Sequence, residues 1–109
     1  MRIHFTFRNL ESSDGIKAHA SDKLTRMQKY VRAPLEVTVT VWTEALLHCV
    51  DMSLMVDGRR YAARESSEDM YASIDMAVDK IDRQIRDAKA SSRSNKRHSG
   101  EQLALGKNS

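Results

Sequence analysis

The sequence predicts an α+β protein in which two helices pack on one face of a four-stranded, mainly antiparallel sheet, in the order β-α-β-β-β-α. Three observations predict this two-layer sandwich. Several segments alternate apolar and polar residues, as half-buried strands do. Two other segments repeat apolar residues every three or four positions, as amphipathic helices do. An Asp-Gly pair between two strand-like segments indicates a hairpin.

The first strand and the first helix are expected within residues 2–34. Residues 2–7 alternate, with Ile3 and the two phenylalanines on one side of the chain. Ser12 and Ser13 can cap the helix that follows. Its apolar stripe consists of Ile16, Ala20, Leu24, Met27 and Val31. Pro34 is expected to end this helix, because proline lacks an amide hydrogen and disfavours helical geometry at the preceding residue.

Three further strands are expected to form a meander. Residues 35–44 alternate β-branched residues, and this pattern points Trp42 away from the core. Residues 48–56 form the next strand, and Asp57-Gly58 is a type I′ turn signal that returns the chain. This turn places Val56 opposite Arg59, Leu54 opposite Tyr61 and Met52 opposite Ala63. Trp42 and Met55 then lie on the outer face, where they pack on the tail, touch RNA or a protein, or are simply exposed.

The second helix is expected to begin at a capping box made by Ser66 and Asp69. Its apolar stripe consists of Met70, Ile74, Val78, Ile81 and Ile85. The pattern ends near Ala90, and the rest is rich in serine and basic residues without periodicity. The sequence therefore predicts a folded domain at residues 1–90 and a basic, disordered tail at residues 91–109.

Composition limits the class of protein. A chain of 109 residues with 40% hydrophobic and 30% charged residues suits a single globular domain plus a tail. No apolar run is long enough to cross a bilayer, and the N-terminus lacks the features of a secretory signal. Cys49 is the only cysteine, so an internal disulfide is excluded. We expect a cytoplasmic protein without a membrane partner.

Charge is segregated along the chain, although the net charge is only +3. Residues 23–32 contain four cations and no acid, and residues 89–97 repeat this pattern. Three arginines also follow the predicted hairpin turn. Basic blocks of this kind suit a polyanionic partner, although solvated surfaces carry similar runs.

The residues that carry enzyme chemistry are sparse. No histidine has a partner at a metal-binding interval, and the four glycines form no phosphate-binding loop or nucleophile elbow. Asp75, Asp79 and Asp82 recur on one side of the second helix. A metal site is one interpretation, but a solvated flank that pairs with Arg86 and repels nonspecific polyanions is favoured. We expect no enzyme activity, no cofactor, no bound metal and no small-molecule substrate.

The second helix carries a specific resemblance. The residues from Asp69 to Asp75, followed by Asp79-Lys80-Ile81 and Arg83-Gln84-Ile85, resemble the second-helix motif of the bacterial ribosome hibernation-promoting factor and ribosome-associated inhibitor family. These proteins are also described as sigma-54 modulation proteins or S30AE domains. The resemblance extends loosely backward over residues 1–90 and implies the sandwich predicted above, a shape related to double-stranded RNA-binding domains.

The resemblance implies a non-catalytic ribosome hibernation factor. Such a protein binds the small ribosomal subunit, through its RNA and neighbouring ribosomal proteins, in the channel for messenger and transfer RNA. It silences translation in stress or stationary phase and modulates ribosome dimerisation. The RNA-binding residues that the resemblance implies are Lys80, Arg83 and Arg86, with Arg8, Lys23, Arg26, Lys29 and Arg64 as weaker candidates.

Two features of the chain leave alternatives open. It ends at Ser109, so we expect a short form without the extra C-terminal domain of long family members, and its basic tail fits either promotion or blocking of ribosome pairing. A general double-stranded RNA binder and a protein-interaction module that uses the outer face around Trp42 and Met55 are the alternative functions.

Overall fold

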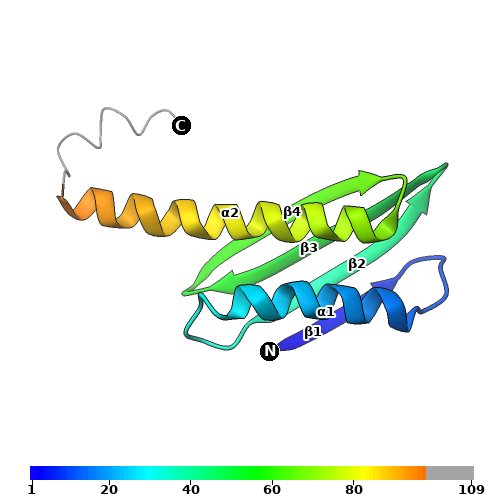
Figure 1. The fold of residues 1–109 in the computed structure, drawn as a ribbon, viewed down its shortest axis with the longest axis horizontal. Coiled ribbons are helices and arrows are strands. Elements are labelled where there is room, and N and C mark those ends of the chain that lie inside the picture. The colour runs from blue at the N-terminus through cyan, green and yellow to red at the C-terminus, as the bar shows by residue number, and fades with distance from the viewer. Residues whose placement is uncertain (98–109) are drawn as a thin grey trace.

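The computed structural model describes the backbone of residues 1–97 and the side chains of residues 1–90. Its elements are β1 (Arg2–Phe7), α1 (Asp14–Gln28), β2 (Glu36–Glu44), β3 (Leu47–Val56), β4 (Arg59–Ser67) and α2 (Met70–Arg97). The four strands form one sheet in the order β1-β2-β3-β4, in which only β1 and β2 are parallel. Both helices cover the same face of the sheet (Figure 1). The predicted fold class is confirmed.

The hairpin between β3 and β4 has the predicted register. Asp57 and Gly58 adopt φ values of 51° and 76°, as both central residues of a type I′ turn must. Val56 pairs with Arg59, and Met52 with Ala63. A slip of one residue would exchange the two faces of β4, so this turn decides which arginines of β4 point away from the helices.

The core lies between the helices and the sheet. Val37, Val39 and Val41 of β2 are completely buried, as are Leu24 of α1 and Ile74 of α2. Burying one side chain of this kind stabilises the fold by about 1.5–3 kcal/mol. Interiors packed in this way are dense, so the helix and strand backbones that carry the surface side chains are held rigidly.

The first helix begins as predicted but ends early. Ser13 caps it, since its Oγ accepts a hydrogen bond from the Ile16 amide at 3.2 Å. The prediction that Pro34 ends the helix is wrong, because α1 ends at Gln28. The Gln28 side chain donates to the carbonyls of Val31 and Ala33 and accepts from the Leu35 amide, at 3.0–3.1 Å. These bonds satisfy the loop backbone, so the chain leaves the helix without losing hydrogen bonds.

The second helix begins three residues later than a cap at Ser66 would place it. Ser66 belongs to β4 and pairs with Cys49, so the predicted capping box is wrong. Asp69 is the cap instead, and its carboxylate accepts from the Ala72 amide at 3.3 Å. The pairing of β3 with β4 extends to Ser67, so Ser66, which the sequence pattern assigned to the cap, is part of the strand.

The second helix also continues beyond Ala90. It runs to Arg97, so residues 91–97, assigned to the tail from the sequence, are helical. Adding a residue to an existing helix costs little, and Ala88, Lys89 and Ala90 are strong helix formers. Residues 98–109 lie outside the described part of the chain, and the division into domain and tail stays a prediction.

Candidate nucleic-acid interface

The predicted RNA-binding residues fall on both sides of the sheet. Lys23, Arg26 and Lys29 of α1 and Lys80, Arg83 and Arg86 of α2 belong to the helix layer. Arg64 lies on the opposite face of the sheet, opposite Asp51, and Arg8 follows directly after β1. The structure therefore does not bring the eight residues into one surface. We call the two groups the helix face and the outer face.

A groove of about 200 Å³ runs between the two helices on the helix face. Its lining includes three of the predicted residues, Lys23 and Arg26 from α1 and Arg86 from α2. The Arg86 guanidinium lies 4.7 Å from the centre of the Tyr30 ring, a cation–π distance. Lys89 donates to the Tyr30 carbonyl at 2.7 Å and so ties α2 to the end of α1. Tyr30 was not among the residues predicted from the sequence, because it lies just beyond the helix and off its apolar stripe.

Three aspartates of α2 lie beside cations of the two helices. The Lys23 ammonium lies 3.8 Å from a carboxylate oxygen of Asp75 and 3.7 Å from one of Asp79. Arg86 pairs with Asp82 at 3.2 Å, as predicted. The Asp75 and Asp79 side chains are still 40% and 69% exposed, so the row is a partly solvated flank that also pairs with a cation of α1. Helical periodicity placed them on one side of α2, but only the packing of α1 beside α2 decided what that side meets.

A second contact holds the N-terminal halves of the helices together. His19 of α1 forms a 2.7 Å hydrogen bond with the Asp75 carboxylate and meets the Tyr71 ring edge to face at 4.9 Å between ring centres. A Cβ atom at Gly15 would come within 2.7 Å of the Tyr71 hydroxyl oxygen. A larger residue at position 15 would therefore have to displace the end of the Tyr71 side chain. These contacts fix the spacing of the cations on the two helices.

The opposite flank of α2 lies beside the edge strand β4. Lys80 pairs with Glu65 of β4 at 3.2 Å, and Gln84 donates to the Ala62 carbonyl at 3.2 Å. Arg83 is exposed between them and forms no ion pair within the described part of the chain. Arg26 and Lys29 are also exposed and have no ion-pair partner among residues 1–90. The helix face thus contains both neutralised and uncompensated cations.

The outer face contains a cluster centred on Trp42. The guanidinium carbons of Arg8 and Arg64 lie 4.6 and 5.3 Å from the centre of the indole ring. Arg64 also pairs with Asp51 at 2.9 Å. Trp42 points away from the core as predicted, yet only 9% of it is exposed. Met55 shares this face and is 52% exposed.

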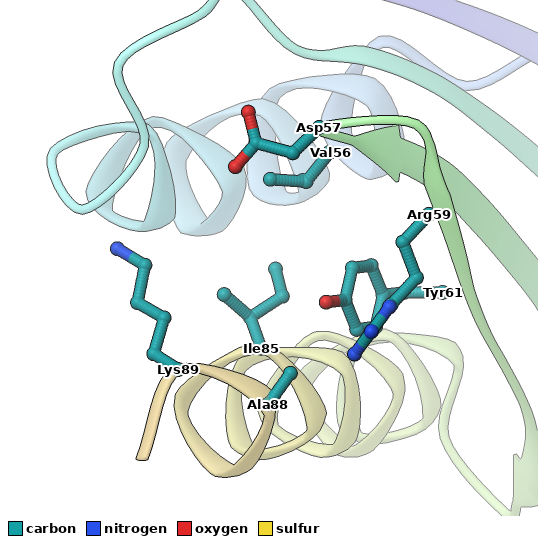
Figure 2. A pocket seen from close by; sticks show the side chains of 7 residues that line it. All are labelled: Val56, Asp57, Arg59, Tyr61, Ile85, Ala88 and Lys89. Atoms are coloured by element: carbon teal, nitrogen blue, oxygen red, sulfur yellow. The ribbon is translucent and has the colours of Figure 1, made fainter. Parts of the chain in front are cut away.

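A third feature is a groove of about 380 Å³ between the β3–β4 hairpin and the C-terminal half of α2. Figure 2 shows Ile85, Ala88 and Lys89 of α2 facing Val56 and Asp57 of the hairpin, with Tyr61 and Arg59 of β4 beside them. Its lining offers one carboxylate, one phenol and two cations, with no nucleophile beside a base. An enzyme site requires a convergent set of catalytic groups, for example a nucleophile beside a base.

A metal site and a membrane-spanning helix are both absent from the residues that the structure describes. Within this part of the chain, no three His, Cys, Asp or Glu side chains are grouped so that they could hold a metal ion. Likewise, neither helix, over its described length, is long and apolar enough to cross a membrane.

Comparison with known proteins identifies the family of the chain. Residues 3–93 match the model of the "Sigma 54 modulation protein / S30EA ribosomal protein" family, and the chain belongs to this family. The resemblance inferred from the α2 motif is confirmed.

The chain is also similar to individual proteins whose names refer to ribosome hibernation. A ribosome hibernation promoting factor of Azotobacter vinelandii is 29% identical over 85 residues, which cover 78% of this chain and 79% of that protein. A ribosome hibernation promotion factor of Lactococcus lactis subsp. cremoris is 37% identical over 90 residues, covering 77% of this chain and 48% of the longer relative.

A solved structure supports the fold. The crystal structure of the Thermus thermophilus Protein Y N-terminal domain superposes with a TM-score of 0.74 at 29% identity. The match covers 78% of this chain and 96% of that domain. The described sandwich is therefore the fold of the family.

Proposed function

We propose that this protein is a ribosome hibernation factor that binds the small ribosomal subunit in the channel for messenger and transfer RNA and so silences translation. The family match over residues 3–93 carries this proposal. The helix face supports it, because its cations stand on two packed helices at fixed spacing. Ribosomal RNA is bound largely through phosphate contacts and shape, which such a surface suits.

The helix face offers phosphate two kinds of cation. Arg26, Lys29 and Arg83 are exposed and lack a carboxylate partner among residues 1–90, so phosphate can bind them directly. Lys23, Lys80 and Arg86 are paired with carboxylates of the same chain. Phosphate must replace or join these carboxylates. The Lys80 and Arg86 side chains are more than half exposed, and exposed ion pairs contribute only about 0–1 kcal/mol each, so the exchange at these two residues costs little when a phosphate is correctly placed.

The carboxylates also provide selectivity. Asp79 and Asp82 lie beside the cations of the groove and repel a phosphate backbone that approaches in the wrong register. A plain RNA duplex presents phosphates at regular spacing and meets acids as well as cations. A folded RNA channel whose phosphates match the cations avoids this repulsion. The protein then acts by occupying space that messenger and transfer RNA need.

The test is co-sedimentation of the protein with purified small subunits at increasing salt. We expect binding at low salt and a linear fall of log affinity with log salt concentration, because bound cations displace counterions from RNA. A matched plain RNA duplex should compete poorly. Binding that is absent or insensitive to salt would overturn the proposal, and equal affinity for the duplex would indicate a general double-stranded RNA binder.

A sucrose-gradient profile of whole ribosomes extends the test to ribosome pairing. The full chain is compared with a variant that ends after Arg97, which keeps all of α2. We propose that the protein changes the ratio of paired to single ribosomes. A difference between the two chains assigns the effect on pairing to residues 98–109, equal changes with both chains assign it to residues 1–97, and profiles that match ribosomes without added protein would contradict the proposed effect.

A further inference from the structure

The outer face presents a feature that the helix face does not explain. Trp42 is the only tryptophan of the chain and points away from the core, yet it is 9% exposed. Two arginines from opposite edges of the sheet lie over its ring, Arg8 after β1 and Arg64 in β4. Covering an indole with apolar groups would bury it as well, so the use of guanidinium groups needs a reason.

The two arginines differ in their remaining partners. Arg64 pairs with Asp51 at 2.9 Å, whereas Arg8 has no carboxylate partner among residues 1–90. A cation–π contact uses the flat face of the guanidinium and leaves the N–H groups at its edge. Those N–H groups are the donors that bind phosphate in a bidentate manner. Arg8 is therefore held in place by the indole with its charge uncompensated.

The surroundings of the cluster favour a phosphate over a protein partner. Thr6 of β1 lies opposite Thr40 of β2, so hydroxyl groups follow the cluster across two strands on the same face, and the next residue across, Asp51 of β3, is the partner of Arg64. Hydroxyl and guanidinium groups are common ligands of nucleic-acid phosphates. A protein–protein interface centres on aromatic, Met and Arg side chains that a partner can still bury, whereas the Trp42 side chain is already only 9% exposed. Among the described residues of the four strands, Met55 is the only large hydrophobic residue that is more than half exposed.

We propose that Arg8, Trp42 and Arg64 form a second phosphate-binding site, which takes the backbone of an RNA strand on the side of the sheet opposite the helix face. Arg8 supplies the free guanidinium, Trp42 orients it, and Arg64 adds a second set of donors beside Asp51. That the phosphate belongs to ribosomal RNA rests on the proposed function, whereas anion binding at the cluster does not. With both faces engaged, the domain would be held between two segments of RNA.

The single tryptophan allows a direct test, because emission from Trp42 reports on the groups that lie over its ring. The full-length protein is titrated with a short single-stranded oligouridylate. We expect a saturable change of emission whose midpoint rises roughly tenfold in Arg8→Gln, since one phosphate contact is lost. Arg60→Gln is the matched control, because Arg60 is an exposed arginine about 13 Å along β4 from Arg64, on the same face but outside the cluster. It should shift the midpoint less than about twofold.

Two outcomes of this titration would overturn the site. If Arg8→Gln titrates like Arg60→Gln, the cluster has a structural role only. If an oligoglutamate peptide changes the emission and the oligouridylate does not, the face binds an acidic protein segment. Circular dichroism of each variant checks that the fold is retained, and Arg8 is exposed, so its replacement leaves the core unchanged.

Small-subunit binding separates this inference from the proposed function. We expect Arg8→Gln to weaken co-sedimentation and to lower the slope of log affinity against log salt by about 1, and Arg60→Gln to do neither. Wild-type binding that Arg8→Gln leaves unchanged would overturn the second site on the ribosome while the proposed function stands. Absence of wild-type binding together with the expected fluorescence results would overturn the proposed function and leave the anion site.

Discussion

The helix face and the outer face hold arginine and lysine side chains in different ways. On the helix face, carboxylates of the same chain neutralise Lys23, Lys80 and Arg86. On the outer face, an indole holds Arg8 and Arg64, and among residues 1–90 only Arg64 has a carboxylate partner. A carboxylate positions a cation but cancels its charge, whereas an aromatic ring positions it and leaves the charge intact.

The difference shows why a count of basic residues describes this surface poorly. Both faces contain predicted RNA-binding residues, but only part of their charge is uncompensated within the described chain. Selectivity is expected from the face where acids and cations alternate. Unconditional attraction of phosphate is expected where the cation has no acid beside it. The predictions below test this contrast.

The largest effect is expected from reversing charge on α2. In Lys80→Glu/Arg83→Glu, two cations become repulsive, so binding to small subunits should weaken by about a hundredfold or more. Co-sedimentation at fixed salt measures this. Lys17→Glu/Arg60→Glu makes the same change in net charge at positions with no predicted RNA contact. If both double variants lose binding equally, attraction depends on net charge alone and the helix face has no special role.

The next effect concerns stability of the outer face. Trp42→Ala should lower the free energy of unfolding by about 2 kcal/mol, because it removes a nearly buried indole and two cation–π contacts. This is less than for a tryptophan enclosed in a core, since one side of the cluster meets solvent. Urea unfolding followed by circular dichroism measures it. Met55→Ala, on the same face but 52% exposed, is the control and should change stability by less than about 0.5 kcal/mol.

A smaller effect is expected from removing the acids beside Lys23. Asp75→Asn/Asp79→Asn leaves that ammonium uncompensated, so affinity for a plain RNA duplex should rise about fivefold and the preference for small subunits should fall. Competition binding with the two RNAs measures the ratio. Glu11→Gln/Glu68→Gln removes two exposed acids that form no ion pair within residues 1–90. An equal gain in this control would contradict a selective role for the aspartates.

The smallest effect is expected at the Arg2–Glu36 pair on the outer face. Its groups lie 3.4 Å apart, and their side chains are 73% and 65% exposed. Arg2→Gln should therefore change the free energy of unfolding by less than about 0.5 kcal/mol. The urea midpoint measures this. A loss above about 1 kcal/mol would mean that exposed pairs on this sheet contribute more than solvent screening allows.

The sequence by itself determined the elements, their order and most of their faces. Alternation in β2 placed Val37, Val39 and Val41 in the core, and Asp57-Gly58 set the β3–β4 register. These features are local, because strand alternation and turn geometry depend on neighbouring residues along the chain. The motif of α2 is likewise a local feature, and it is enough to indicate the family.

Only the tertiary structure decided where the elements end and what the charged side chains meet. Gln28 ends α1 through bonds to a loop, and Ser66 is taken into the strand pairing of β4. The eight predicted cations divide between two faces, and Asp75 and Asp79 turn toward Lys23 because α1 packs beside α2. Such contacts join residues far apart in the chain, and no periodicity within one segment contains them. The cover of Trp42 has the same origin, since Arg8, Trp42 and Arg64 meet only when the four strands lie side by side.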